Sequence, residues 1–300
     1  MTAAATTDAA PPPGSNGAGR RVSRFFSRHP RTQLGSLLGV PLIWLLVIYL
    51  GSLVALLLTS LYTTDPFTGD LVKTVSLDNF SELIHNPTFR TVTLRTLGIA
   101  ASVTVIDFCL ALPIAFFMAK VASRRWRRGL AVALVLPLWA SYLVKAYCWR
   151  AILDPSSGVM KQTLGFSPGY GVVGATIVLS YLWLPYMALP IYAGLEKLPD
   201  SLLDASGDLG GKAGRTFWSV VLPLLKPSIL AGAIFTFSLS LGDYITVQIV
   251  GGKAQMIGNV IYRDFGAGLL PEAAAFAFIP VLIMIAFLLM VRRSGALDNL

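Results

Sequence analysis

Long apolar runs alternate with short polar segments along most of the chain. A soluble helix of this length would carry a charged face, which these runs lack. Each run is close to or longer than the roughly 20 residues that a helix needs to cross a bilayer. The pattern predicts an all-α polytopic membrane protein with six spans, at residues 34–62, 94–118, 130–148, 172–195, 229–250 and 273–291.

Two of the polar segments are long. Residues 63–93 contain turn and cap signals such as Asp65-Pro66 and Asn86-Pro87, and residues 77–84 could form a short amphipathic helix at the outer surface. Residues 251–271 are expected to form a second polar outer loop. Neither segment has room for a soluble domain of normal size. Any catalytic or ligand-capturing domain must therefore belong to another chain.

The composition agrees with a membrane protein, since 55% of the residues are hydrophobic and only 13% are charged. A formal charge of +9 could suggest nucleic-acid binding, but the basic residues cluster at the ends of apolar runs, as membrane orientation requires. Cys109 and Cys148 both lie inside apolar runs, which favours buried small side chains over a disulfide or metal pair. His29 and His85 are far apart, and no metal site is expected.

The distribution of lysine and arginine predicts the orientation. With the amino terminus inside, sixteen of the 24 basic residues fall on the cytoplasmic side. Both termini and the 196–226 loop are then cytoplasmic. The first apolar run is too long for a cleaved signal peptide. We expect a disordered basic tail at 1–30, a transmembrane permease domain at 31–293 and a short cytoplasmic tail at 294–300.

The 196–226 loop carries the most specific motif. Its residues fit the spacing Glu-Ala-Ala, three residues, Gly, nine residues, Ile-x-Leu-Pro, with Asp in place of Glu and Ser in place of the second Ala. This motif resembles the cytoplasmic coupling loop of the membrane subunits of ABC importers. The resemblance implies contact with a separate ATPase through Asp204, Ala205, Ser206, Gly210, Val220, Leu222 and Pro223.

Local signals in the loop agree with a lever-like structure. Asp200 or Ser201 could cap a short helix after Pro199, glycines would then break it, and a second helix would start near Arg215. The alternative is an ordinary solvated loop. Gly211-Lys212 looks like the end of a phosphate-binding loop, but both ends of that motif fail and no strand precedes it. We therefore expect no ATP site in this chain.

Residues 35–293 are similar to the permease subunits of type I ABC importers, with a methionine-permease-like helical core. Within that family, residues 136–150, 241–252 and 257–261 resemble the spermidine/putrescine branch, and the first of its two permeases. Permeases for ferric iron, other cations or small organic acids share fragments of these stretches and remain alternatives.

The resemblance implies a multi-pass subunit of the bacterial inner (plasma) membrane that performs no bond chemistry. Its partners would be membrane lipid, a second permease, a dimer of ATPase subunits that holds ATP and Mg²⁺, and an extracytoplasmic solute-binding protein. No cofactor would bind this chain, and no nucleic acid is implied. The resemblance also implies that ATP binding draws the coupling loops together and opens the pathway outward.

Ionisable groups inside a membrane are costly and mark candidate pathway residues. Asp107 lies midway along the second run, and Asp243 lies within the fifth beside Tyr244. A carboxylate next to an aromatic ring suits an ammonium group through ion pairing and cation–π attraction. As alternatives, Asp243 could cap a broken helix or pair with Lys145 or Arg150, and Asp107 could bond a neighbouring helix.

Four aromatic residues gather near the outer end of the third run. These residues are Trp139, Tyr142, Tyr147 and Trp149. We expect them to form either an interfacial belt or a gate that lines the pathway of a cationic solute. A secondary transporter or channel without an ATPase would favour inverted repeats, and none is evident. A membrane enzyme would need a nucleophile–base or metal constellation, which the runs and loops lack.

Overall fold

The computed structural model describes residues 30–65 and 68–293, and it divides the chain into two compact units, residues 1–56 and 57–300. The described part of the first unit belongs to one apolar helix, α2 (Pro30–Ser60), whose last residues enter the second unit. The predicted tails at 1–30 and 294–300 lie outside the described residues, apart from residue 30. The predicted domain bounds therefore remain predictions.

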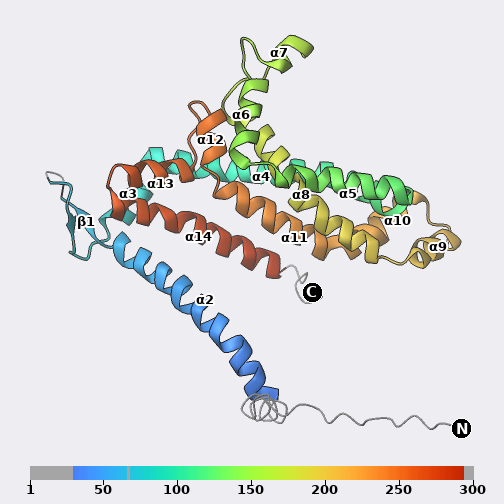
Figure 1. Cartoon of the computed structure of the whole chain (residues 1–300), viewed down its shortest axis with the longest axis horizontal. Helices are drawn as coiled ribbons and strands as arrows, with labels where there is room; N and C mark the ends of the chain where they lie inside the picture. Colours follow the sequence, from blue (N-terminus) through green and yellow to red (C-terminus); the bar gives the residue numbers. More distant parts are fainter. Residues whose placement is uncertain (1–29, 66–67, 294–300) are drawn as a thin grey trace, which may run out of the picture. The chain divides into compact units, whose positions relative to one another are not determined.

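Three long helices lie at the centre of the second unit (Figure 1). They are α4 (Pro87–Phe116), α8 (Val172–Lys197) and α11 (Leu222–Leu241), and each packs against the other two. Small residues allow this approach: a Cβ at Gly232 of α11 would stand only 2.8 Å from the sulfur of Met187 in α8. Small residues at interfaces are how helices in membranes reach close contact.

Short segments extend the central helices at one end. The π-helical segment η1 (Phe117–Val121) continues α4. Helix α10 (Ala213–Thr216) and the π-helical segment η2 (Phe217–Val221) lead without interruption into α11. Phe116, the last residue of α4, and Phe217, the first of η2, meet edge to face with their ring centroids 6.0 Å apart, so the end of α4 contacts η2.

The opposite end is built from shorter helices around the last one. Helices α3 (Asp78–His85) and α13 (Ile257–Gly266) both contact α14 (Leu270–Arg293), and a two-residue hairpin, β1 (Thr63–Thr64) with β2 (Leu71–Val72), precedes them. The predicted helix at 77–84 is therefore confirmed. The prediction of a polar loop at 251–271 is wrong, because Ile257 and Val260 are buried on one face of α13.

The third predicted span is not one straight helix. Helix α5 (Arg124–Trp139) is followed by α6 (Tyr142–Ile152) at a bend of 98°, where Ala140 and Ser141 are extended. Pro137 weakens the end of α5, and Lys145 Nζ donates to the Pro137 carbonyl at 3.0 Å. The third predicted span, at 130–148, therefore corresponds to a pair of helices with a sharp bend between them. Beyond α6 the chain forms α7 (Val159–Leu164).

The fifth predicted span is also interrupted. Helix α11 ends at Leu241, the chain turns at residues 242–244, and the separate helix α12 (Ile245–Val250) follows. Across residues 30–65 and 68–293, five helices are long and apolar enough to cross a membrane, and a sixth span requires counting α5 and α6 together. The all-α fold is confirmed.

The two cysteines differ from expectation. Cys109 and Cys148 are free, and both are exposed rather than buried. Apolar side chains of a membrane protein face outward as well as inward, so an apolar run does not show which of its residues are buried.

Candidate functional site

The turn between α11 and α12 places a carboxylate inside the second unit. Asp243 caps α12, since its Oδ1 accepts the Thr246 backbone N–H at 2.9 Å. The turn rests on α13: a Cβ at Gly258 would lie 3.0 Å from Tyr244 Cβ, and Asn259 Nδ2 donates to the Tyr244 carbonyl at 2.8 Å. Backbone contacts on both sides thus fix the direction of the Asp243 side chain.

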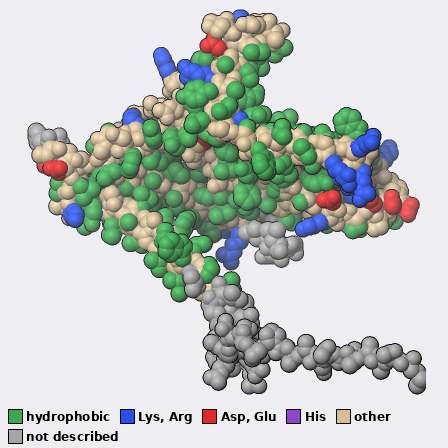
Figure 2. Space-filling model, in the orientation of Figure 1, with side chains coloured by type: hydrophobic (Ala, Val, Ile, Leu, Met, Phe, Trp, Pro, Cys, Tyr) green, Lys and Arg blue, Asp and Glu red, His purple; other side chains and the backbone are tan. Residues whose placement is uncertain are grey.

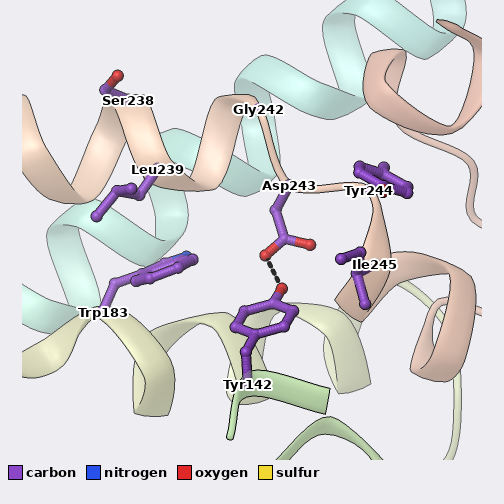
Figure 3. A pocket seen from close by; sticks show the side chains of 8 residues that line it. All are labelled: Tyr142, Trp183, Ser238, Leu239, Gly242, Asp243, Tyr244 and Ile245. Carbon is purple, nitrogen blue, oxygen red and sulfur yellow. Dashed lines mark hydrogen bonds between the residues drawn. The ribbon is translucent and has the colours of Figure 1, made fainter. Parts of the chain in front are cut away.

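The other Asp243 oxygen faces α6. The Tyr142 hydroxyl donates to Oδ2 (Figure 3), and the Thr246 hydroxyl donates to the same oxygen at 3.3 Å. Lys145 binds a carbonyl of α5, and Arg150 Nη1 donates to the Ile249 carbonyl at 2.6 Å. Within the described ranges no lysine or arginine pairs with Asp243. The bond to the Thr246 N–H supports the capping alternative, while the alternative of an ion pair with Lys145 or Arg150 is not seen among the described residues.

A pocket of about 370 Å³ opens beside this carboxylate. Tyr142 and Trp183 are stacked on one side of it, with centroids 6.1 Å apart. Tyr244 was expected to act together with Asp243, but its ring stacks on Tyr262 at 4.9 Å and lies to the side of the carboxylate in Figure 3. The lining comprises Tyr142, Trp183, Ser238, Leu239, Gly242, Asp243, Tyr244 and Ile245.

Sequence reasoning missed Trp183. This residue lies between Leu182 and Leu184 in an apolar stretch of α8 that also holds Tyr181 and Tyr186, so only its position in space distinguishes it from its aromatic neighbours. The four aromatic residues predicted as a group differ in their surroundings, and Tyr142 and Trp149 pack against the same buried cluster. Trp139 is 88% exposed, Tyr147 is exposed, and Trp149 packs on Tyr181.

Asp107 lies away from solvent in the α4 face that packs on α8 and α11. Its side chain is completely buried, and neither carboxylate oxygen has a hydrogen-bond partner among the described protein atoms. The Ser180 hydroxyl of α8 lies beside it without completing a hydrogen bond. Asp107 thus belongs to the interior of the helix bundle, while Asp243 borders a pocket.

The loop before α10 has the predicted helix–break–helix form. Helix α9 (Asp200–Asp208) is followed by residues 209–212 and then by α10. Gly210 has a φ of +77°, the left-handed conformation that glycine adopts without cost. The expected cap is wrong, because neither Asp200 nor Ser201 caps α9 and the capping position is Pro199.

Helix α9 has two distinct faces. Leu202, Ala205 and Leu209 are exposed and share one side at helical spacing, and Leu209 is 90% exposed. Leu203 packs towards the bundle, and the Ser206 hydroxyl bonds that of Thr216 at 2.8 Å. Figure 2 shows acidic and basic side chains gathered at this end of the second unit.

The other motif residues differ in position. Asp204 is exposed on α9, whereas Val220 lies in η2 and Leu222-Pro223 form the first turn of α11. The motif therefore covers both an exposed helix and the start of a membrane span. Ser206 was expected to face a partner, but it faces Thr216.

The loop between α6 and α8 is organised around Asp154. Ser156 and Ser157 donate through hydroxyls and N–H groups, Tyr170 adds its hydroxyl at 3.0 Å, and these bonds lower the pKa of the Asp154 carboxyl well below its usual range. Desolvation and the bond to Asp154 raise the pKa of Tyr170. This loop, which includes α7, projects beyond α6 (Figure 1).

Residues 100–297 match the family described as the inner membrane component of binding-protein-dependent transport systems. The chain belongs to this family. It is thus a multi-pass inner-membrane permease subunit of a binding-protein-dependent ABC importer and does not itself catalyse a reaction. Family membership removes the alternative of a transporter that works without an ATPase.

Individual relatives are also named as permeases. The chain is 42% identical over 299 residues to the inner membrane ABC transporter permease protein YdcU of Escherichia coli, covering 93% of this chain and 95% of that one. It is 30% identical over 265 residues to the spermidine/putrescine permease PotB of the same organism, covering 80% and 90%.

Solved structures share the fold. A bacterial ABC transporter that imports alginate aligns with a TM-score of 0.69 at 18% identity, over 91% of this permease and 99% of that chain. The MetNI methionine transporter aligns with a TM-score of 0.54 at 18% identity, over 68% and 94%. The predicted methionine-permease-like core is confirmed.

Proposed function

We propose that this permease forms, with a second permease, the membrane pathway of an ATP-driven polyamine importer. The proposal rests first on likeness to PotB, a spermidine/putrescine permease, over 80% of the chain. It takes the position of the first permease in such a system. An ATPase dimer on the cytoplasmic side and a solute-binding protein on the outer side complete the assembly.

The Asp243 pocket is the structural observation that supports a polyamine as the solute. Its carboxylate is hydrogen-bonded only by neutral donors, so its negative charge is not neutralised by a basic side chain in the described part of the chain. Aromatic rings of Tyr142 and Trp183 border the same space. An ammonium group would gain both an ion pair and cation–π attraction there. Asp107, in the packed interior, is a second and more remote candidate.

The exposed side of α9 supports the coupling role. Leu202, Ala205 and Leu209 form an apolar stripe on a helix outside the membrane spans, and Asp204 lies beside it. We propose that this stripe binds the ATPase, and that Val220, Leu222 and Pro223 pass the movement into α11. The basic residues around α9 support a cytoplasmic position for this helix and for both termini, by the positive-inside rule.

Uptake of labelled spermidine by the complete importer tests the solute. Asp243→Asn keeps an oxygen for the cap on Thr246 but removes the charge. We expect uptake to fall about tenfold, equivalent to about 1.4 kcal/mol, because asparagine cannot form an ion pair with an ammonium group. Asp70→Asn, which removes an exposed carboxylate of the outer hairpin, should transport normally. Unchanged kinetics in Asp243→Asn would contradict the proposed contact, and uptake of an organic acid or metal complex instead would identify another solute class.

The coupling role is tested separately. Gly210→Pro forbids the φ of +77°, and Asp204→Lys reverses a charge on the exposed face. Both variants should reach the membrane, and both should lose ATPase binding and uptake. Full uptake by both would show that α9 does not couple the two subunits.

A further inference from the structure

The chain turns sharply between α8 and α9, at a corner formed by residues 196–200. Leu198 ends α8 in an extended conformation, and Pro199 continues it. The last carbonyls of a helix have no partner within the helix and need one elsewhere. The Leu198 carbonyl accepts from Lys120 Nζ at 2.7 Å, and the same ammonium lies 2.6 Å from Asp200 Oδ1.

Lys120 comes from a different span. It lies in η1, at the cytoplasmic end of α4, 78 residues before Leu198 in the chain. Arg127 of α5 donates from Nη2 to the Ala119 carbonyl at 3.2 Å, which holds the backbone next to Lys120. Arg127 Nη1 also lies 3.7 Å from Glu196 Oε1. Arg127 of α5 thus holds the backbone beside Lys120, while the Lys120 ammonium binds the corner at residues 196–200.

The two contacts of Lys120 differ in how strongly they stabilise the corner. Asp200 is 78% exposed, and ion pairs with solvent-exposed partners contribute little. The Lys120 side chain is only 12% exposed, and Leu198 is buried. A charge-assisted hydrogen bond in such surroundings is among the stronger ones. The bond to the Leu198 carbonyl is therefore the main contact, and the Asp200 bridge adds to it.

From this geometry we propose that Lys120 is a positioning residue for energy coupling. It fixes the corner between α8 and α9, so that a force applied to α9 reaches α4 as well as α8. Without the ammonium, α9 would keep its covalent link to α8 but could swing at the corner without moving α4. The proposal rests on the proposed binding of α9 to the ATPase.

The test uses the complete importer in proteoliposomes and measures labelled spermidine transported per ATP hydrolysed. Lys120→Met removes the ammonium and keeps a long side chain, and Lys120→Arg keeps a donor. Arg125→Met is the matched control, because Arg125 is an exposed basic residue five positions later in the chain, in α5. A second readout is photo-cross-linking to the ATPase from a benzophenone maleimide on Leu209→Cys, with Cys109 and Cys148 replaced by serine.

Lys120→Met should keep the cross-link and ATP hydrolysis while the ratio of solute to ATP falls about tenfold, within the range of energetic coupling between sites. Lys120→Arg should recover most of the ratio, and Arg125→Met should match the unmodified chain. An unchanged ratio in Lys120→Met, or loss of assembly in that variant, would overturn the proposal, since the lysine would then be dispensable or purely structural. A missing cross-link with the lysine intact would instead overturn the binding of α9 to the ATPase.

Discussion

Glycines in the segment from α9 to α10 have different structural roles at neighbouring positions. Gly210 supplies a φ of +77° for the break. Gly211 allows close packing, since a Cβ there would lie 2.6 Å from the Ser206 carbonyl oxygen and 3.0 Å from Thr216 Oγ1. Gly214, in α10, has open space around its Cβ position. The sequence shows four similar glycines here, and only the structure separates their roles.

These contacts predict opposite effects of two alanine substitutions. Gly211→Ala should force α9 away from Thr216, at a cost of about 1–3 kcal/mol for an overpacked site, and should lower uptake. Gly214→Ala should be neutral or slightly stabilising, because alanine favours a helix by about 1 kcal/mol. Uptake and thermal unfolding of the purified importer measure both effects. Equal behaviour of the two variants would contradict the packing described for Gly211.

The lowered pKa of Asp154 predicts how the loop between α6 and α8 responds to pH. Because its folded pKa is lowered, its stabilising contribution is complete above the usual carboxyl pKa of about 4 and disappears only as pH falls below that value. Hydrogen exchange in residues 153–171, corrected for intrinsic rates, should therefore be the same at pH 7 and pH 5. Asp154→Asn should exchange several-fold faster at both values. Marked loosening of the unmodified loop at pH 5 would contradict this assignment.

At the same scale, sequence reasoning identified Asp243 but not its surroundings. A lone carboxylate in an apolar run is visible in the sequence. Its partner Tyr142 is 101 residues away, so the hydrogen bond depends on how α6 and α12 pack. Tyr244 is adjacent in sequence and faces Tyr262 instead. Sequence neighbours in an extended turn point in different directions, which is why the expected pair is separated.

Among the helices, the break between α5 and α6 and the break between α11 and α12 determine where the Asp243 pocket lies. The bend at residues 140–141 turns α6 so that Tyr142 reaches α12, and the turn at 242–244 presents Asp243 to it. Hydropathy located the apolar runs but not these breaks, because one or two polar residues hardly change the average of a long run. The spacing of apolar residues in α13 was present in the sequence, and it was overlooked because the segment is polar overall.

Helix α13 supports the second break, which leads to a test within one helix. Gly258→Val would press on Tyr244 Cβ, 3.0 Å from the new Cβ, and on the Asp243 carbonyl at 3.4 Å. Gly266→Val, in the last turn of the same helix, meets open space. We expect Gly258→Val to reduce spermidine uptake about tenfold, as an overpacked site costing 1–3 kcal/mol would, and Gly266→Val to transport normally. Normal uptake by both would show that the turn does not depend on α13.

For the whole molecule, charge counting predicts the orientation. The positive-inside rule predicts that the basic residues of 120–128 and 196–226 lie on one side of the membrane, and the structure brings these two segments together through Lys120. Fold class and family could be predicted from the hydrophobic runs and one spaced motif. The contact between the two segments could not, since nothing in either one specifies the other.

Accessibility to a membrane-impermeant maleimide tests this orientation. In a chain with serine at positions 109 and 148, Leu209→Cys should react only from the cytoplasmic side, because Leu209 is 90% exposed on the segment assigned there. Ser156→Cys, in the outer projection, should react only from the outside. Reaction of both from the same side would contradict the assigned topology.

The most direct test of the account compares two sets of proteoliposomes under a spermidine gradient. One holds the complete importer with ATP and its solute-binding protein, and the other holds this chain with its sister permease but without the ATPase. The account predicts uptake only in the first set, lost when ATP is withheld. Spermidine entry in the second set would contradict the claim that this bundle depends on a separate ATPase for transport.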